Sequence, residues 1–548
     1  MKTLQNLAVL SAGVFSLISS VAGMPAQISV SAEAETGTWQ YDEETKTLTI
    51  SGEWLGFYDG YGEDTRPWAA LKTSAEAVVF GDDVKRIPAD AISGFQKVKS
   101  VTIPEGIEEI GTGAFSSCSS LEQITLPDSL KTIDSYAFMG CSGLTSVTLP
   151  EQITVIPSYA FEDCTSLTDV TIPEKAEDFG ADVFKNTAWL KARRAENPLV
   201  VLNGILIDGA ECKGAVQIPE GVKKIGMNAF SKNYEMTAVS FPDSLQSLSF
   251  HSFSECAALE KVVIPKQVQT VAEYAFFNCD NLKSAVIEDG VTGVGFGAFA
   301  ACDKLSEIEI PESVNEIGGY AFVSTPWMEK QQEKNPLVVV NNILVDGTKC
   351  KNEVVIPDGI KMMTEYAFEH SELTSVVIPE SIDLIPFAAF SSCMELKSVT
   401  IPASVETLDT NAFAGCENLS EVTIPATVEH FGYTVFADCE PTIKGYTGSA
   451  AETYAKENKL TFVAIGTPEN EAKPITGDAN IDGAVDISDA VLTSRFINAD
   501  KNAVVTDSGL QNADVDGDGA VGTEDVTVML QYIARTIRVF PANANAKA

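Results

Sequence analysis

The stretch at residues 121–143, LEQITLPDSLKTIDSYAFMGCSG, decides the fold of this chain, because its pattern recurs on both sides of it at a nearly constant spacing. Each copy carries an Ala-Phe pair or a close variant, and successive phenylalanines lie 23 residues apart, except for two steps of 46 and one of 22. The phenylalanines that mark the copies are Phe115, Phe138, Phe161, Phe184, Phe230, Phe253, Phe276, Phe299, Phe322, Phe368, Phe390, Phe413 and Phe436. A fixed period in the range of about 20–50 residues predicts a repeat solenoid, in which each coil buries its apolar edge against the next.

Within one copy, the residues predict a short strand and a core filler. Ile124 and Leu126 alternate with polar residues as in a strand, and Pro127 ends it. The small Ala137 and the large Phe138 then fill the interior once per coil. Stacked in register, the coils predict parallel sheets of short strands and a column of phenylalanine rings.

The pattern LxxVxIPxxVxxIxxxAFxxC resembles the BspA-like, bacterial surface-antigen type of leucine-rich repeat over about residues 80–440. The resemblance implies a leucine-rich-repeat solenoid of stacked short parallel strands, which offers a surface for binding rather than a reaction centre. We expect an N-terminal cap and first coil at residues 35–92, the solenoid at 93–440 and a C-terminal cap at 441–466.

Residues 1–34 have the features of a secretory signal peptide. Lys2 supplies the positive start, residues 7–23 form the apolar run, and cleavage could follow Ala22 or Ala34. A membrane anchor is the alternative, but Ser and Gly dilute the run, and about 20 apolar residues are needed to span a bilayer. We therefore expect a secreted, extracellular or cell-surface-associated protein that has no membrane segment in its mature form.

The net charge of −40 bears on the partners. It disfavours nucleic acid and anionic membrane surfaces, because their phosphates would be repelled. It suits a protein that binds cations.

The segments that flank the repeats predict caps, since an open solenoid end would expose the core. TWQYDEETKTLTISG (38–52) predicts two strands around a polar turn, and residues 441–466 predict a strand, a helix and a final strand. Five aromatic residues near the N-terminal cap could shield the first coil or form a sugar-stacking platform, and capping is the favoured interpretation. They are Trp54, Phe57, Tyr58, Tyr61 and Trp68.

The two double-length repeats, residues 185–229 and 323–367, lie 138 residues apart and match each other. Each predicts a short amphipathic helix, one strand (LVVLNGILI or LVVVNNILV) and an ordinary coil. We expect lateral bulges on the solenoid. Our hypothesis is that a specific ligand site on the repeats would lie beside these bulges.

Nine of the eleven cysteines stand three residues after a core phenylalanine. Their side chains would point the same way in neighbouring coils, so buried free thiols are favoured over disulfides, and no coil offers four ligands for a metal. Of the three histidines, His370 takes the place that cysteine holds elsewhere. The repeats offer no catalytic constellation, and we expect a protein that is not an enzyme.

Beyond a linker at residues 467–476, two matched acidic loops predict calcium sites in a module at residues 477–541. DANIDGAVDISD (478–489) and DVDGDGAVGTED (514–525) place oxygen ligands at loop positions 1, 3, 5, 7, 9 and 12, which is the cage that Ca²⁺ prefers. The first loop would bind through Asp478, Asn480, Asp482, the Ala484 carbonyl, Asp486 and Asp489. The second loop would bind through Asp514, Asp516, Asp518, the Ala520 carbonyl and Asp525. Two ions are expected, and their binding should be coupled to folding of the module.

This module resembles a type I dockerin over about residues 476–540, because aspartate closes each EF-hand-like loop and each loop is followed by an apolar helix. The resemblance implies a small all-α domain that docks into a cohesin of a scaffoldin in a cellulosome-like assembly. By matching position, the cohesin-facing residues would be Ile487, Ser488, Ser494 and Arg495 in the first half, and Thr523, Glu524, Leu530, Gln531 and Arg535 in the second. Since the two sets differ, we expect one face to dominate.

These features predict a secreted, non-catalytic component that a dockerin joins to a scaffoldin, with the repeats as a protein- or carbohydrate-binding, adhesive surface. An alternative is an accessory to polysaccharide-degrading hydrolases, since dockerins mostly accompany such enzymes. Another is an adhesin or protease-directed ligand that acts without a scaffoldin. The sequence does not name the ligand of the repeats.

Overall fold

The computed structural model describes residues 37–54, 64–466, 476–477, 479, 485, 487–497, 510, 513–515 and 520–533, together with the backbone of residues 27–30. Of residues 487 and 488 it describes the backbone alone. The chain divides into two compact units, residues 1–316 with 321–329, and residues 317–320 with 330–548.

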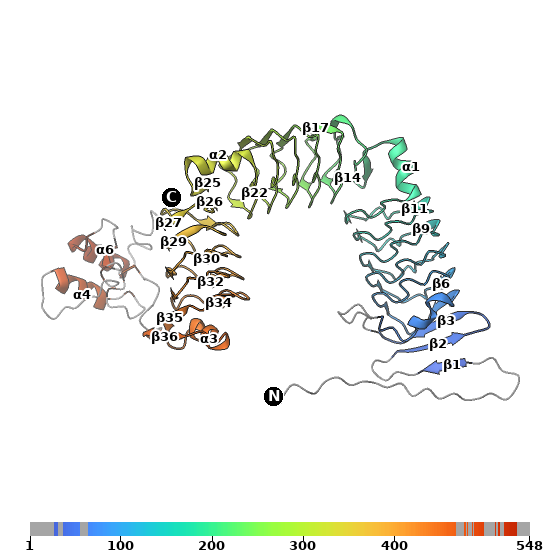
Figure 1. Ribbon diagram of the computed structural model, residues 1–548, viewed down its shortest axis with the longest axis horizontal. Helices are drawn as coiled ribbons and strands as arrows, with labels where there is room; N and C mark the ends of the chain where they lie inside the picture. The colour runs from blue at the N-terminus through green and yellow to red at the C-terminus, as the bar shows by residue number, and fades with distance from the viewer. Residues whose placement is uncertain are drawn as a thin grey trace. The chain divides into compact units, whose positions relative to one another are not determined.

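Each ordinary coil of the first unit contributes up to two short strands, and both kinds pair in parallel with their counterparts in neighbouring coils (Figure 1). The longer strands are β6 Ser100–Thr102, β9 Ser146–Thr148, β11 Asp169–Thr171, β15 Gly214–Gln217, β17 Met236–Ser240, β19 Lys261–Ile264, β21 Ser284–Ile287 and β23 Glu307–Glu309. The shorter ones are β5 Arg86–Ile87, β7 Glu109–Ile110, β8 Thr132–Ile133, β10 Val155–Ile156, β12 Asp178–Phe179, β16 Lys224–Ile225, β18 Ser247–Leu248, β20 Thr270–Val271, β22 Gly293–Val294 and β24 Glu316–Ile317.

The register confirms the predicted 23-residue solenoid. In the pair β19–β21, Val262 lies opposite Ala285 and Ile264 opposite Ile287, each step being one repeat. These inward side chains are buried, whereas the intervening Val263 is exposed, as the alternation of a strand requires.

The phenylalanine column forms the centre of each unit. Phe253, Phe276 and Phe299 are fully buried, and their rings stack nearly parallel with centroids 5.1 and 5.3 Å apart. In the second unit Phe390 and Phe413 stack at 5.1 Å. The predicted aromatic stacks are therefore present, and they hold neighbouring coils at a constant spacing.

The second unit repeats the plan over fewer coils. Its six-stranded sheet contains β27 Lys351–Val355, β29 Glu372–Val377, β31 Ser398–Thr400, β33 Glu421–Thr423, β35 Thr442–Tyr446 and β36 Phe462–Gly466. Its shorter strands are β28 Met362–Met363, β30 Leu384–Ile385, β32 Thr407–Leu408 and β34 His430–Phe431. Helix α3 Ala450–Glu457 begins at Ser449, whose Oγ accepts from the Glu452 N–H, and completes the predicted strand, helix and strand after the last coil.

The predicted pair of strands at the N-terminal cap is confirmed. β2 Thr38–Asp42 and β3 Thr47–Ser51 are antiparallel, and the sheet continues in parallel through β4 Ala77–Phe80 to β6, with the short helix η1 Ala69–Thr73 before β4. On its other side β2 pairs with β1 Gln27–Val30. Since β1 lies within residues 1–34, cleavage after Ala22 would keep it and cleavage after Ala34 would remove it.

Two tryptophans of the cap face inward. Trp68 is fully buried, donates from Nε1 to the Ala91 carbonyl at 2.7 Å, and packs against Trp54 with ring centroids 5.0 Å apart. These two residues therefore cover the first coil and do not form a sugar platform. Phe57, Tyr58 and Tyr61 lie outside the described residues.

The double-length repeats differ from the prediction in one respect. Helices α1 Ala188–Glu196 and α2 Pro326–Lys334 are present, but the predicted single strands are hairpins, β13 Val200–Leu202 with β14 Ile205–Asp208, and β25 Val338–Val340 with β26 Ile343–Asp346. Asn203 and Gly204 turn the first hairpin, with φ angles of 48° and 80°. Asn-Gly adopts this left-handed turn at low cost, so the prediction of one strand was wrong because it overlooked the turn.

All eleven cysteines are buried and free. The Cys141 thiol donates to the Phe115 carbonyl of the preceding coil at 3.1 Å, and Cys279 donates to Phe253 at 3.2 Å. Burial raises the pKa of the Cys279 thiol well above its usual range, so the thiol stays protonated as a small core group and a donor.

The predicted place of His370 was wrong. Ser371, three residues after Phe368, is buried and occupies the cysteine position, with its hydroxyl 3.3 Å from the Cys393 sulfur. The His370 side chain is 69% exposed. The deletion in the short coil therefore lies after the cysteine position rather than before it.

Candidate functional site

Two helices 36 residues apart form the described part of the C-terminal module. They are α4 Ile487–Ile497 and α6 Thr523–Ile533. Thr493 and Met529 hold equivalent positions, both are buried, and the Thr493 Oγ lies 3.8 Å from the Met529 sulfur. The two loop-helix halves thus pack against each other through matching positions, around a small core that includes Ala490, Ala513 and Val515.

The acids at position 12 of the two loops are buried. Asp489 is 0% exposed and Asp525 is 1% exposed. The Asp525 carboxylate accepts from the Val515 N–H at 2.8 Å and from the Gly522 N–H at 2.7 Å, so it ties the beginning and end of the second loop to α6. Buried carboxylates need hydrogen bonds or a cation, and hard oxygen donors in this position suit Ca²⁺.

The other calcium-ligand assignments remain predictions. Within the second loop, Asp514 is half-buried and Ala520 is exposed. Among the described residues, no group of three or more potential ligating side chains comes together. The remaining predicted ligands lie outside the described residues: Asp478, Asn480, Asp482, Ala484, Asp486, Asp516 and Asp518.

The predicted cohesin-facing residues divide between the two helices. On α6, the side chains of Thr523, Glu524, Leu530 and Gln531 are exposed. On α4, Arg495 is exposed and Ser494 is half-buried. Ile487 and Ser488 lie in the first turn of α4, where only the backbone is described, and Arg535 lies outside the described residues.

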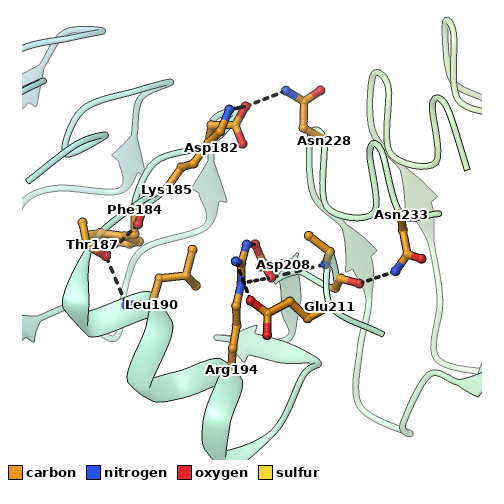
Figure 2. Close-up of polar contacts among 12 residues, drawn as sticks. Asp182, Phe184, Lys185, Thr187, Leu190, Arg194, Asp208, Glu211, Asn228 and Asn233 are labelled. Atoms are coloured by element: carbon orange, nitrogen blue, oxygen red, sulfur yellow. Dashed lines mark hydrogen bonds and ion pairs between the residues drawn. The ribbon is translucent and has the colours of Figure 1, made fainter. Parts of the chain in front are cut away.

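Figure 2 shows the first double-length repeat, where the sequence placed a possible ligand site. Thr187 begins α1, its hydroxyl accepting from the Leu190 N–H at 3.1 Å. Further along the helix, Arg194 donates to both carboxylate oxygens of Asp208 at 2.9 and 2.5 Å and to Glu211 at 3.2 Å. Burial lowers the pKa of Arg194, but the hydrogen bonds and negative charges of Asp208 and Glu211 together outweigh this effect and raise the pKa. The bulge is therefore clamped to its own hairpin by a bidentate ion pair.

The second double-length repeat replaces this ion pair by neutral contacts. Gln332, 138 residues after Arg194, donates to Asp346 at 2.9 Å, and Thr348 also donates to Asp346, at 3.1 Å. Burial raises the pKa of the Asp346 carboxyl, although these hydrogen bonds oppose it.

The two aspartates should therefore respond oppositely to replacement by asparagine. Because the pKa of Asp346 is raised by folding, the folded chain binds the proton more tightly, and the stability from this group is lost as pH rises from about 4 through the raised pKa. Asp346→Asn should raise the melting temperature at pH 8 and change it little at pH 4. Burial also raises the pKa of Asp208, but Asp208→Asn leaves the half-buried Arg194 guanidinium without its bidentate carboxylate partner. This variant should therefore instead lower the free energy of unfolding by about 2 kcal/mol at pH 8. Melting curves at both pH values test this, and destabilisation by both variants at pH 8 would contradict it.

An aromatic cluster on the first unit was not anticipated. The His251 and Tyr274 rings stack 5.0 Å apart, and Phe250 packs edge-on against both, at 4.2 and 5.6 Å. No aromatic residue stands at the exposed positions of the longer strands of this unit. The signal lay elsewhere, in the two residues that precede the Ala-Phe pair, which are aromatic in several coils.

Two grooves lie on the first unit. One, of about 450 Å³, lies beside α1 and the first hairpin, and its lining includes Arg193, whose guanidinium stands 5.3 Å from the Trp189 ring centroid. A larger groove of about 720 Å³ lies beside Phe250, three coils away from the helix. In the described part of the chain, no helix is long and apolar enough to cross a membrane.

Comparison with protein families identifies both parts of the chain. The model of the BspA-type leucine-rich repeat region matches six copies, at residues 70–191, 212–329 and 342–443, which is more than half of the chain. The model of the type I dockerin domain matches residues 476–534. The two resemblances inferred from the sequence are thereby confirmed.

Several solved structures are similar to the chain. A leucine-rich cell surface protein of Faecalibacterium prausnitzii is 21% identical, with 79% of this chain and 98% of that one covered and a TM-score of 0.28. A leucine-rich repeat protein of Bacteroides ovatus is also 21% identical, with 79% and 99% covered and a TM-score of 0.28. One from Eubacterium ventriosum is 16% identical, with 76% and 95% covered and a TM-score of 0.27. A search of curated proteins gave no match.

Proposed function

Because the chain belongs to the BspA-type leucine-rich repeat family and ends in a type I dockerin domain, we propose that it is a secreted, non-catalytic component of a cellulosome-type assembly. The dockerin binds a cohesin of a scaffoldin, and the repeat body displays an adhesive or ligand-binding surface. The observation that carries this proposal is the dockerin match, together with the two buried position-12 aspartates, Asp489 and Asp525.

Calcium is the cofactor that we propose, with one ion in each loop. The carboxylates of the loops repel one another without a cation, so binding of the ions and folding of the module are coupled. Asp489 and Asp525 supply buried oxygens, and the main chain around Asp525 is already held by its hydrogen bonds to Val515 and Gly522.

The test is titration calorimetry of the full chain against a panel of cohesins, in calcium and in chelator, beside a chain that ends at Gly466. We expect tight binding to at least one cohesin in calcium, and none in chelator or after truncation. Cohesin binding by the truncated chain would contradict the proposal, and so would a full chain that binds none of the cohesins. Release of reducing sugar from polysaccharides by the full chain would contradict its non-catalytic part.

The α6 face should carry most of the cohesin affinity. Leu530 is 42% exposed, whereas its α4 equivalent, Ser494, is half-buried and polar. Burying a leucine on docking contributes about 1.5–3 kcal/mol, so Leu530→Ala should weaken binding roughly tenfold or more. Ser494→Ala should change it by less than about threefold. The same calorimetry distinguishes the faces, and a larger loss from Ser494→Ala would assign the interface to α4.

A further inference from the structure

The larger groove of the first unit lies between two neighbouring coils, at the level of β18 and β20. Its volume is about 720 Å³, within the range of small-molecule sites. The side chains that define it are Gln246, Phe250, Gln267, Gln269, Thr270 and Glu273.

At this groove the ladder between the coils is interrupted. One sheet runs β13-β14-β16-β18 and another begins at β20, so the described residues form no ladder between β18 and β20. On one side, Gln246 and Ser249 donate to the Lys223 and Ile225 carbonyls at 2.7 and 3.0 Å. On the other, Thr292 and Gly295 donate to the Gln269 and Val271 carbonyls at 2.8 and 2.7 Å. The corresponding bonds, from Gln269 to Gln246 and from Ala272 to Leu248, are absent from the described structure.

Proline explains comparable interruptions elsewhere but not this one. The shorter-strand ladder also stops between β8 and β10 and between β28 and β30. There Pro157 and Pro386 stand where the next coil would donate its second N–H. The corresponding residue at the groove is Ala272, which has an N–H. The missing ladder between β18 and β20 is therefore a local feature of these two coils, and it leaves main-chain donors and acceptors beside the groove.

A side-chain acceptor in the groove wall is also unused. The Oε1 atom of Gln267 is buried and has no hydrogen-bond partner among the described residues. A buried amide oxygen without a donor destabilises the folded chain, and a hydroxyl of a ligand would supply the missing donor. Gln267 lines the same groove as Phe250, whose ring is 39% exposed.

We propose that this groove binds a neutral oligosaccharide, with a sugar ring against the Phe250 face and its hydroxyls hydrogen-bonded to Gln267, Gln269 and Glu273. A pyranose has an apolar C–H face that packs on an aromatic ring, and a rim of hydroxyls that both donate and accept. Amide side chains offer both functions, and a carboxylate accepts two hydroxyl protons. The groove therefore combines the two kinds of group that a sugar needs.

The charge of the lining selects against other ligands. No lysine or arginine stands among the lining residues, while Glu273 carries a negative charge. Phosphorylated, sulfated or uronic-acid ligands would be repelled without a compensating cation. This inference rests on the proposed role of the repeat body as a binding surface, and it does not depend on cohesin docking.

The test is titration calorimetry of the full chain in calcium with cellohexaose, xylohexaose and mannohexaose, and with an oligogalacturonate as the anionic comparison. At least one neutral hexasaccharide should bind and the galacturonate should not. Phe250→Ala should weaken that binding about tenfold or more, and Phe250→Trp should keep it within about threefold. Tyr433→Ala is the control, because Tyr433 is 86% exposed at the same place of its coil and does not line the groove. It should leave the affinity unchanged.

Gln267→Leu separates a binding role from a structural one. Removing the unpartnered oxygen should raise the melting temperature of the free chain while weakening the sugar at least threefold. Equal affinity in the parent chain and Phe250→Ala, binding of the galacturonate alone, or no sugar binding would overturn the proposal. A cohesin titration of the same sample keeps the outcomes apart: cohesin binding without sugar binding overturns the groove assignment alone, and the reverse overturns cohesin docking alone.

Discussion

Replacing Asp525 by alanine is expected to reduce the calcium stoichiometry from two ions to one and to weaken cohesin binding at least about a hundredfold. Asp525 is 1% exposed, and its carboxylate accepts the N–H groups of Val515 and Gly522. Each hydrogen bond to a charged group contributes about 1.5–3 kcal/mol. The two together therefore equal the free energy of unfolding of about 3–5 kcal/mol that a domain of this size typically has. The variant also loses an oxygen that we propose as a calcium ligand, so the second loop should open. Calcium titration of the full chain, followed by cohesin titration, measures both effects.

Glu524→Ala is the matched control for calcium. Glu524 is the adjacent acid, it lies on the surface, and its carboxylate accepts only the Thr523 hydroxyl within the described structure. The variant removes the same charge but should keep both ions. Asp489→Ala, at the equivalent position of the first loop, should behave like Asp525→Ala. Two bound ions in the Asp525 variant would show that the position-12 carboxylate is a structural clasp and not a ligand.

The repeat spacing was enough to predict the solenoid, because every coil buries equivalent apolar residues against its neighbours. A phenylalanine at a fixed place in each coil can only stack if the coils are in register, and the rings of Phe253, Phe276 and Phe299 do so. The same logic placed the cysteines inside. Where the repeat pattern is interrupted, the local residues determine the structure, as the turn at Asn203 and Gly204 shows. The wrong placement of His370 has a comparable cause. In the 22-residue coil, the one-residue deletion fits the repeat pattern equally well before or after the cysteine position.

The features of the candidate surfaces were harder to predict because they depend on spacing between main chains. The coils that contain β18 and β20 both keep the repeat pattern. No residue type in them therefore indicates that the hydrogen-bond ladder between the two strands is missing. The Arg194–Asp208 clamp likewise joins residues from a helix and a hairpin whose relative placement the sequence left open. Asp489 and Asp525 could be singled out from the sequence because both loops repeat one motif at one spacing. Both are buried, and their role as calcium ligands stays a prediction.

Replacing Phe276 by alanine is expected to destabilise the first unit by about 3–5 kcal/mol. Phe276 is fully buried between Phe253 and Phe299, so its loss removes two ring stacks and leaves a cavity that the neighbouring coils cannot fill. Because each coil of a solenoid contacts mainly its neighbours, the damage should be concentrated around residues 253–299 rather than spread along the repeats. Urea unfolding measures the loss, and hydrogen exchange should show faster opening of β19 and β21 than of β31 and β33.

Phe250→Ala is the control that distinguishes core from surface. Phe250 lies in the neighbouring coil and has the same side chain, but it is partly exposed and belongs to no column of stacked core rings. Its replacement should lower the free energy of unfolding by about 1 kcal/mol or less, because it removes little buried area and leaves no closed cavity. Equal destabilisation by the two variants would mean that the phenylalanine column is not what holds the coils together. A large loss for Phe276 alone would assign one aromatic position to the fold and leave the other free for binding.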